Sequence, residues 1–219
     1  KISKDDFSNK TFKFGYGKFI TINSKKVWAQ RLSYVGELGF ELYIENNDAK
    51  EIYQLIVEEG KNHNLSHCGS HAMDTMRMES GFLHWGHDIS PEENQYQAGL
   101  TFAISYKKEV NFIGKESLLK VKEKKHDRRF IMLSLLDSKP GSPLLLHEEP
   151  IYLKDKIIGR TTSGNYSFNF KKNLSFGYVT SNHTNEELSK MDLYIEVAKQ
   201  KYPAKVEITP LKDKSSRFL

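Results

Sequence analysis

A length of 219 residues, a hydrophobic fraction of 38% and a charged fraction of 28% are typical of a globular protein with one large domain or two small ones. The sequence has no apolar run near the roughly 20 residues that a membrane-spanning helix needs, and its single cysteine, Cys68, excludes an internal disulfide and a cysteine-based metal cluster. The net charge of +5 is spread over many lysines, so it favours an anionic small ligand over nucleic acid.

The first half of the chain alternates strand and helix patterns. Alternating apolar and polar residues predict strands over residues 18–23, 27–33 and 40–44. The first two of these strands meet at Asn23-Ser24, a pair typical of a tight turn. We therefore expect a hairpin near the start of the chain.

Two helices are predicted next. Apolar residues at helical spacing predict an amphipathic helix over residues 48–61, with Asn47-Asp48 supplying its N-cap. A second helix is predicted over residues 70–79, and Gly81 is placed to close it. Beyond these helices, the pattern predicts a loop, a strand and a third helix, over residues 86–95, 100–105 and 115–122 respectively.

The texture of the sequence changes after residue 122. Residues 123–129 are highly charged and contain no apolar side chain, which predicts an exposed linker. Short strands then recur at spacings typical of a small barrel or sandwich, over residues 130–136, 150–153, 156–162, 174–179 and 193–197. Gly159, inside a predicted strand, suggests a bulge. The expected fold is an α+β domain over residues 1–122 and an all-β domain over residues 123–219.

Two carboxylates and two tyrosines gather around the predicted strand 40–44. They are Tyr34, Glu37, Glu41 and Tyr43. In a regular strand the two glutamates would share a face, although Gly36 and Gly39 loosen the backbone around them. A carboxylate there can accept N–H bonds from a flat, nitrogen-rich ring, each worth about 1.5–3 kcal/mol, while the tyrosines stack on it. The alternative is a hairpin with exposed glutamates and edge tyrosines.

Arg77 lies on the otherwise apolar face of the second predicted helix, four residues after Met73. A buried guanidinium is costly unless it is paired. Its partner is either Asp74, three residues earlier, or a ligand carboxylate or one of the glutamates above. The sequence leaves both alternatives open.

His84, Trp85, His87 and Asp88 form a compact polar group after the second helix. This one loop, without further Cys or His at ligand spacing, is a weak zinc signal, so we expect no metal site. The sequence also lacks a readable nucleophile–base–acid trio, a phosphate-binding loop and a dinucleotide fingerprint.

A series of motifs resembles the folate-binding region of the glycine-cleavage T-protein (aminomethyltransferase) superfamily. The motifs lie at residues 33–43, 74–81, 84–89, 98–100, 111–114, 145–151, 159–164 and 176–179. The segments His-Trp-Gly-His-Asp and Leu-His-Glu-Glu-Pro-Ile favour the branch of dimethylglycine and sarcosine dehydrogenases. The resemblance extends over essentially the whole chain.

The resemblance implies that tetrahydrofolate binds in a cavity of an α+β part and that a small antiparallel β-barrel follows. The positions that match folate-binding segments are Tyr34, Glu37, Glu41, Leu42, Tyr43, Arg77 and Phe102. Glu37 matches an acidic residue that holds the pterin edge, and Arg77 matches a basic residue near the folate. Phe102 stands where the dehydrogenases commonly have a folate-contacting tyrosine, so the ring is kept and the hydroxyl is lost.

The resemblance also implies parts that precede this chain. In the family, an earlier segment carries the catalytic aspartate, and the dehydrogenases add an FAD-containing amine-oxidising domain. We therefore interpret the chain as the C-terminal fragment of such an enzyme, inactive alone, with no catalytic residue of its own. Its expected partners are tetrahydrofolate and that N-terminal segment, not nucleic acid or a membrane. The expected compartment is the cytoplasm, or the mitochondrial matrix in a eukaryote. The alternative is a non-catalytic interaction or scaffold module of the same fold.

Overall fold

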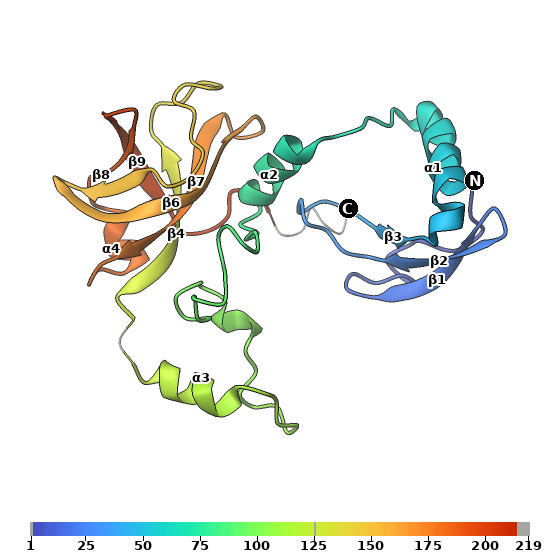
Figure 1. Cartoon of the computed structure of the whole chain (residues 1–219), viewed down its shortest axis with the longest axis horizontal. Helices are drawn as coiled ribbons and strands as arrows, with labels where there is room; N and C mark the ends of the chain where they lie inside the picture. The colour runs from blue at the N-terminus through green and yellow to red at the C-terminus, as the bar shows by residue number, and fades with distance from the viewer. Residues whose placement is uncertain (1, 125, 214–219) are drawn as a thin grey trace. The chain divides into compact units, whose positions relative to one another are not determined.

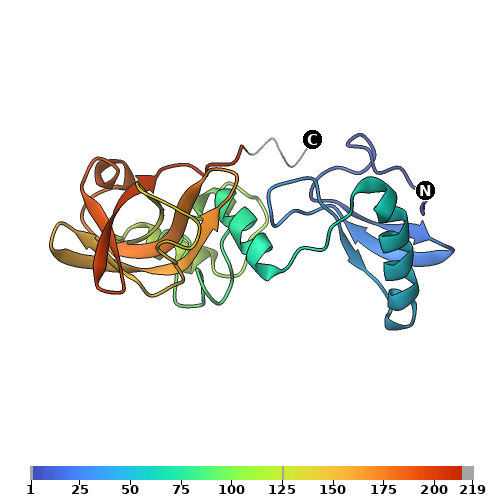
Figure 2. The same ribbon diagram turned by 90° about the horizontal axis from the view of Figure 1, so that it is seen from above.

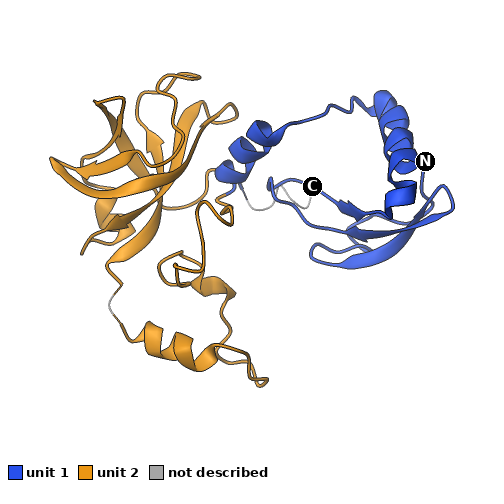
Figure 3. Ribbon diagram, viewed as in Figure 1, with its two compact units in different colours: residues 1–80, 212–219 blue, residues 81–211 orange. Residues whose placement is uncertain are grey.

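The computed structural model describes residues 2–124 and 126–213, which divide into two compact units (Figure 3). Unit 1 comprises residues 1–80 and 212–219, and unit 2 comprises residues 81–211. Lys125 of the predicted linker and the last six residues of the predicted all-β domain lie outside the described residues, as does Lys1. The predicted domain boundary between residues 122 and 123 stays a prediction. The two compact units divide earlier in the chain, after Ser80.

Unit 1 is built on a three-stranded antiparallel sheet in the order β1-β2-β3. The strands are β1 (Gly17–Ile22), β2 (Lys25–Gln30) and β3 (Glu41–Tyr43). Asn23 and Ser24 join the first two with φ values of 45° and 66°, as a tight two-residue hairpin requires. The predicted hairpin is therefore confirmed, and the third strand is shorter than predicted.

Helix α1 (Asn46–Gly60) packs on one face of this sheet (Figures 1 and 2). The core between them consists of the buried side chains Phe12, Ile20, Ile22, Val27, Ala29 and Ile52. The predicted N-cap is wrong, because the helix begins two residues earlier, with Glu45 at the N-cap position and no side-chain cap. Asp48 instead lies in the first turn, where its carboxylate pairs with Lys25 at 2.8 Å.

A short 3-10 turn, η1 (Lys61–His63), follows α1, and Asn64 ends it in the left-handed region with φ 56°. Helix α2 (Ser70–Glu79) has the predicted bounds. Gly81, with φ 71°, stands two residues past its end. No helix among the described residues is both long and apolar enough to cross a membrane.

The predicted strand at residues 100–105 is wrong. The segment contains instead a single 3-10 turn, η2 (Thr101–Ala103), whose hydrogen bonds are local: the Ala103 amide donates to Leu100 at 3.1 Å and the Ile104 amide to Thr101 at 3.1 Å. Helix α3 (Lys115–Lys122) is confirmed. The predicted linker is too long at its end, because the next strand already starts at Arg128.

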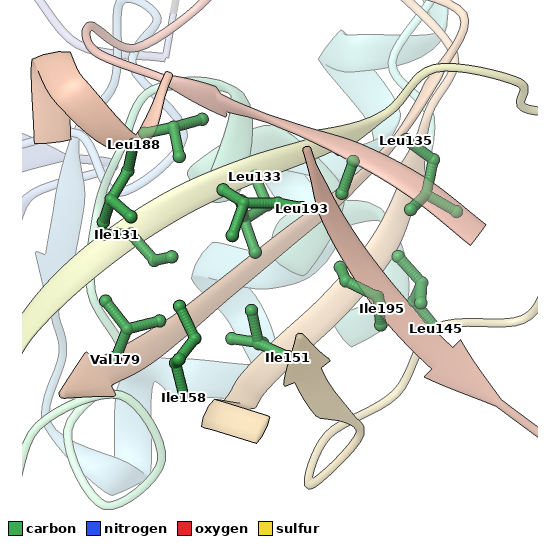
Figure 4. Close-up of a cluster of buried hydrophobic side chains, with 12 residues drawn as sticks. Ile131, Leu133, Leu135, Leu145, Ile151, Ile158, Val179, Leu188, Leu193 and Ile195 are labelled. Carbon is green, nitrogen blue, oxygen red and sulfur yellow. The ribbon is translucent and has the colours of Figure 1, made fainter. Parts of the chain in front are cut away.

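Unit 2 contains a closed six-stranded antiparallel barrel in the order β4-β7-β6-β5-β8-β9. Its strands are β4 (Arg128–Leu135), β5 (Pro150–Leu153), β6 (Lys156–Ser167), β7 (Lys172–Thr180), β8 (Leu193–Val197) and β9 (Gln200–Glu207). Aliphatic side chains from all six strands fill its interior (Figure 4). The sequence prediction missed β9 and the short helix α4 (Asn185–Leu188), which Thr184 opens with a capping box.

A bulge near Gly159 is confirmed. The register of β6 against β5 shifts between Ile151 and Tyr152, so that Ile158 is left over beside Gly159. A side chain at Gly159 would overlap the backbone carbonyl of Tyr178 on β7. The strand therefore needs glycine for close approach of two backbones, besides any role in the bulge.

Candidate functional site

Strand β3 separates the three predicted site residues that it carries. Glu41 and Tyr43 share one face because they are two residues apart, and both are exposed. Leu42 points to the other face and packs against the core of unit 1. The Tyr43 hydroxyl donates to Glu41 Oε2 at 2.7 Å, and this bond raises the pKa of the Tyr43 hydroxyl. The open face therefore presents a carboxylate beside an aromatic ring.

The register of the sheet extends this face across all three strands. Trp28 on β2 lies directly opposite Tyr43, and Phe19 on β1 lies directly opposite Trp28. We call Phe19, Trp28 and Tyr43 the aromatic row. Phe19 and Tyr43 are 56% and 53% exposed and Trp28 is half-buried, so the row borders solvent in unit 1. Gln30 lies opposite Glu41, one step along from the row.

Glu37 lies outside the sheet. Residues 34–38 form a bend, so the expectation that Glu37 and Glu41 share the face of a regular strand is wrong. The Glu37 amide donates to Ser33 Oγ at 2.9 Å, and its carboxylate pairs with Lys212 Nζ at 2.6 Å. Tyr34 lies half-buried in the same bend. Glu37 is thus already neutralised by a lysine, whereas Glu41 faces solvent beside the aromatic row.

Arg77 is buried in α2, with 2% of its surface exposed. Its Nε donates to Asp74 Oδ1 at 3.1 Å. The local ion pair, one of the two alternatives that the sequence left open, is therefore formed. The carboxylate of Asp74 is half-buried, with 32% of the side chain exposed, so the ion pair connects the buried guanidinium to the surface of the helix.

In unit 2, Phe102 lies in η2 and is 84% exposed. It belongs to a different compact unit from the other six predicted site residues, so we describe it by itself. Its ring offers an open apolar surface of the kind that ligands and protein partners cover.

The loop that follows α2 is fixed by Asp88, which is 1% exposed. Its Oδ1 accepts hydrogen bonds from Thr162 Oγ1 at 2.5 Å and Ser163 Oγ at 2.8 Å, both on β6. Its Oδ2 accepts from the His84 amide at 2.9 Å. Trp85, which lies between His84 and Asp88 in the sequence, is 66% exposed. The carboxylate therefore anchors the loop to the barrel and leaves the indole outside.

A second polar cluster lies on β4 and β7 of the barrel. Arg128 donates to Glu93 Oε1 at 2.9 Å and stacks over the Tyr178 ring at 4.1 Å. Burial raises the pKa of Glu93, but bonds from Ser90 and Arg128 outweigh it and leave that pKa lowered. Burial raises the pKa of the Tyr178 hydroxyl, with a further contribution from Glu93. Both groups are held in one protonation state near neutral pH, which is typical of structural polar clusters.

Four residues of these sites were missed in the sequence: Trp28, Gln30, Asp88 as an anchor, and Lys212. Trp28 could have been found, because a two-residue turn at Asn23-Ser24 pairs residue 19 with residue 28. The partners of Asp88 and Lys212 are distant in sequence and carry no local signal.

Comparisons with known proteins agree over most of the chain. Residues 1–108 match the model of the GCVT N-terminal domain, and residues 128–213 match the model of the glycine cleavage T-protein C-terminal barrel domain. The chain is 35% identical to the mitochondrial dimethylglycine dehydrogenase of Rattus norvegicus, over 96% of this chain and 24% of that protein. It is 33% identical to the aminomethyltransferase of Listeria innocua, over 96% of this chain and 55% of that protein.

The fold agrees with a solved structure as well. The aminomethyltransferase T of the glycine cleavage system from Bartonella henselae superimposes with a TM-score of 0.78, at 21% identity, over 94% of this chain and 54% of that one. The chain therefore spans about a quarter of the dehydrogenase and about half of the aminomethyltransferases that it matches.

Proposed function

Because the chain belongs to the glycine cleavage T-protein family, we propose that it is an aminomethyltransferase-type region that binds tetrahydrofolate and orients it as a one-carbon acceptor. The observation that carries this proposal is the open face of β3, where Glu41 and Tyr43 stand together and exposed. A carboxylate beside an aromatic ring suits a flat heterocycle with N–H groups along one edge.

Glu41 is the better placed of the two glutamates for this role. Its carboxylate lies on the same face as the aromatic row and accepts a hydrogen bond from the hydroxyl of Tyr43, two residues along the strand. Glu37 is bound instead to Lys212, whose ammonium would compete with ligand N–H groups for the same oxygens. We assign Glu41 the N–H groups of the pterin edge and Glu37 the fixing of the bend that carries Tyr34.

The bound folate would supply the nitrogen atoms that accept the one-carbon unit. The residues of this chain bind and orient it, which lowers the entropic part of the barrier. Leu42 packs against the core of unit 1 rather than lying on the open face, and Arg77 is buried in α2, where it pairs with Asp74. We place the acid–base group of the reaction in the part of the relatives that lies outside the matched region.

We further propose that the chain works as the C-terminal part of a flavin-dependent dehydrogenase of dimethylglycine or sarcosine type. The support is its 35% identity to a dimethylglycine dehydrogenase of which it covers 24%. In such an enzyme, the flavin would lie in the N-terminal part and this chain would receive the one-carbon unit. The mitochondrial names of the dehydrogenase relatives favour the mitochondrial matrix if the source is a eukaryote, and the cytoplasm otherwise.

A second candidate is a non-catalytic interaction module of the same fold. Two observations favour it. Glu37, which matches the residue that holds the pterin edge, is paired with Lys212 instead. The exposed Phe102 lacks the hydroxyl of the folate-contacting tyrosine that it replaces. The sequence encoded upstream of Lys1 discriminates between the two candidates. A flavin domain followed by a folate segment there supports the enzyme, and an unrelated sequence supports the module.

Isothermal titration calorimetry with tetrahydrofolate, under anaerobic conditions, tests the proposal. We would titrate the 219-residue chain alone and also joined to the part of the Listeria aminomethyltransferase that precedes its matched region. Saturable binding in either protein is the expected result. Absence of heat in both proteins, with each shown to be folded by circular dichroism, would contradict a folate-binding function.

A further inference from the structure

We propose that Trp28 is a positioning residue that stacks on the flat ring of the ligand, beside Glu41 and Tyr43. This inference rests on the proposed folate-binding function and adds a residue of β2 to that site. Trp28 lies directly opposite Tyr43 in the sheet, so its side chain leaves the sheet on the same face as Tyr43 and Glu41.

The sheet holds the indole in a fixed orientation. A Cβ atom at Gly17 would overlap the Trp28 ring, so the indole lies against the backbone of β1 where that strand has no side chain. Phe19 meets the indole edge-on, with ring centroids 5.0 Å apart and an interplanar angle of 72°. An aromatic ring supported on one face and one edge is rigid, and rigidity reduces the entropy lost when a ligand stacks on its other face.

The open part of the aromatic row lies toward Tyr43 rather than Phe19. The Lys26 ammonium lies over the Phe19 ring, 4.0 Å from its centroid. That cation covers one end of the row and repels further positive charge there. The other end continues into Glu41, whose carboxylate accepts a hydrogen bond from the Tyr43 hydroxyl and has further capacity to accept N–H bonds.

The size and the polar groups of the end of the face that carries Glu41 and Tyr43 determine which ligand fits it. Glu41 and Tyr43 are two residues apart, which places them about 7 Å apart along the strand, comparable to the length of a fused two-ring heterocycle. Gln30, opposite Glu41, adds an amide that both donates and accepts. The face therefore fits a planar ring system with N–H groups at one edge, with Trp28 and Tyr43 beneath it.

Tryptophan fluorescence tests this inference directly, because the chain has two tryptophans, Trp28 and Trp85. Trp85 lies in unit 2, and Trp85→Phe leaves Trp28 as the sole tryptophan of the chain. We would titrate this variant with tetrahydrofolate, correcting for absorbed light with free tryptophan as reference. Saturable quenching of Trp28, at the concentration that calorimetry gives for binding, is expected.

Affinity measurements provide the second arm. Trp28→Ala should weaken tetrahydrofolate binding about ten-fold or more, since stacking on an aromatic side chain is lost. Trp28→Phe keeps a ring and should lose only about two- to three-fold. The matched control, Trp85→Phe, should leave the affinity unchanged. If Trp28→Ala does not fold, the Trp28→Phe affinity and the fluorescence titration decide.

The possible results separate this inference from the proposed function. Calorimetric binding with unquenched Trp28 emission, and with unchanged affinity in the Trp28 variants, would overturn the inference and leave folate binding intact. Absence of calorimetric binding would overturn both. A concentration-dependent blue shift of Trp28 without ligand, with dimers in sedimentation velocity, would assign the face to a second copy of the chain and also overturn the inference.

Discussion

The ammonium of Lys212 lies 2.6 Å from the carboxylate of Glu37, although 175 residues separate them in the sequence. The same lysine lies 3.4 Å from the Val35 carbonyl, and its amide donates to Glu79 at 2.9 Å. The segment after the barrel therefore returns to unit 1 and fixes the bend before β3. This contact decides which glutamate of unit 1 is available to a ligand.

We predict that Glu41→Gln weakens tetrahydrofolate binding about ten-fold or more, because a charge-assisted hydrogen bond contributes about 1.5–3 kcal/mol. Glu37→Gln is the matched control. It should change the affinity less than about two-fold and the stability by less than about 1 kcal/mol, because its pair with Lys212 is half-exposed. Calorimetry and urea unfolding measure the two effects. A larger loss of affinity in Glu37→Gln than in Glu41→Gln would mean that Glu37, and not Glu41, binds the pterin edge.

We predict that Asp88→Ala destabilises unit 2 by about 3 kcal/mol. The substitution removes a buried carboxylate and leaves the hydroxyls of Thr162 and Ser163 without that acceptor. Urea unfolding followed by circular dichroism measures the loss. Asp155→Ala, at an exposed carboxylate 3.5 Å from Lys201, should change stability by less than about 0.5 kcal/mol. Equal effects of both substitutions would mean that Asp88 does not anchor the loop.

We predict that Gly159→Ala destabilises the barrel by about 3 kcal/mol or more, because the new methyl group would overlap the Tyr178 carbonyl and push β6 away from β7. Gly69→Ala is the control, because no atom lies within 4 Å of the added carbon. It should cost about 1 kcal/mol at most, as expected at an N-cap position. Thermal unfolding of the two variants gives the comparison, and a tolerated Gly159→Ala would exclude the close approach.

The sequence predicts the parts of the fold that local patterns determine. The Asn23-Ser24 turn sets the register of β1 and β2, and the periodicity of residues 70–79 sets α2. Residues 100–105 mislead, because alternation of apolar residues is also compatible with a 3-10 turn when the hydrogen bonds close locally. Strand β9 was missed because Pro203 and two lysines weaken its strand signal, while closure of the barrel stabilises it.

The candidate site likewise contains residues whose placement a local pattern predicts and residues whose placement depends on distant parts of the chain. Glu41 and Tyr43 could be placed on one face from their spacing alone. The ion pair of Glu37 depends on Lys212, far away in the sequence, so no local pattern could predict it. The sequence could not decide the partner of Arg77, because Asp74 lies within reach on α2 whether or not a ligand carboxylate or another glutamate is also available.

The last prediction concerns acid stability and Glu207 on β9. Burial raises the pKa of this carboxyl, but the Ser134 hydroxyl at 2.6 Å and the Lys172 ammonium at 3.2 Å outweigh it, so the pKa lies below the ordinary 4.5. A carboxyl with a lowered folded pKa stabilises the protein above its unfolded pKa, and that contribution is lost as the pH falls through the folded value. We therefore expect Glu207→Gln to destabilise the chain at pH 7 and to differ less from the native chain as the pH falls below about 4.5.

Urea unfolding at intervals from pH 7 to pH 2 measures this convergence. Glu92→Gln, at an exposed glutamate, is the control and should run parallel to the native chain over the whole range. A constant gap between Glu207→Gln and the native chain at every pH would mean that the carboxylate acts by packing rather than by charge. Convergence in the acid range alone assigns the effect to the bonds that β9 makes with Ser134 and Lys172.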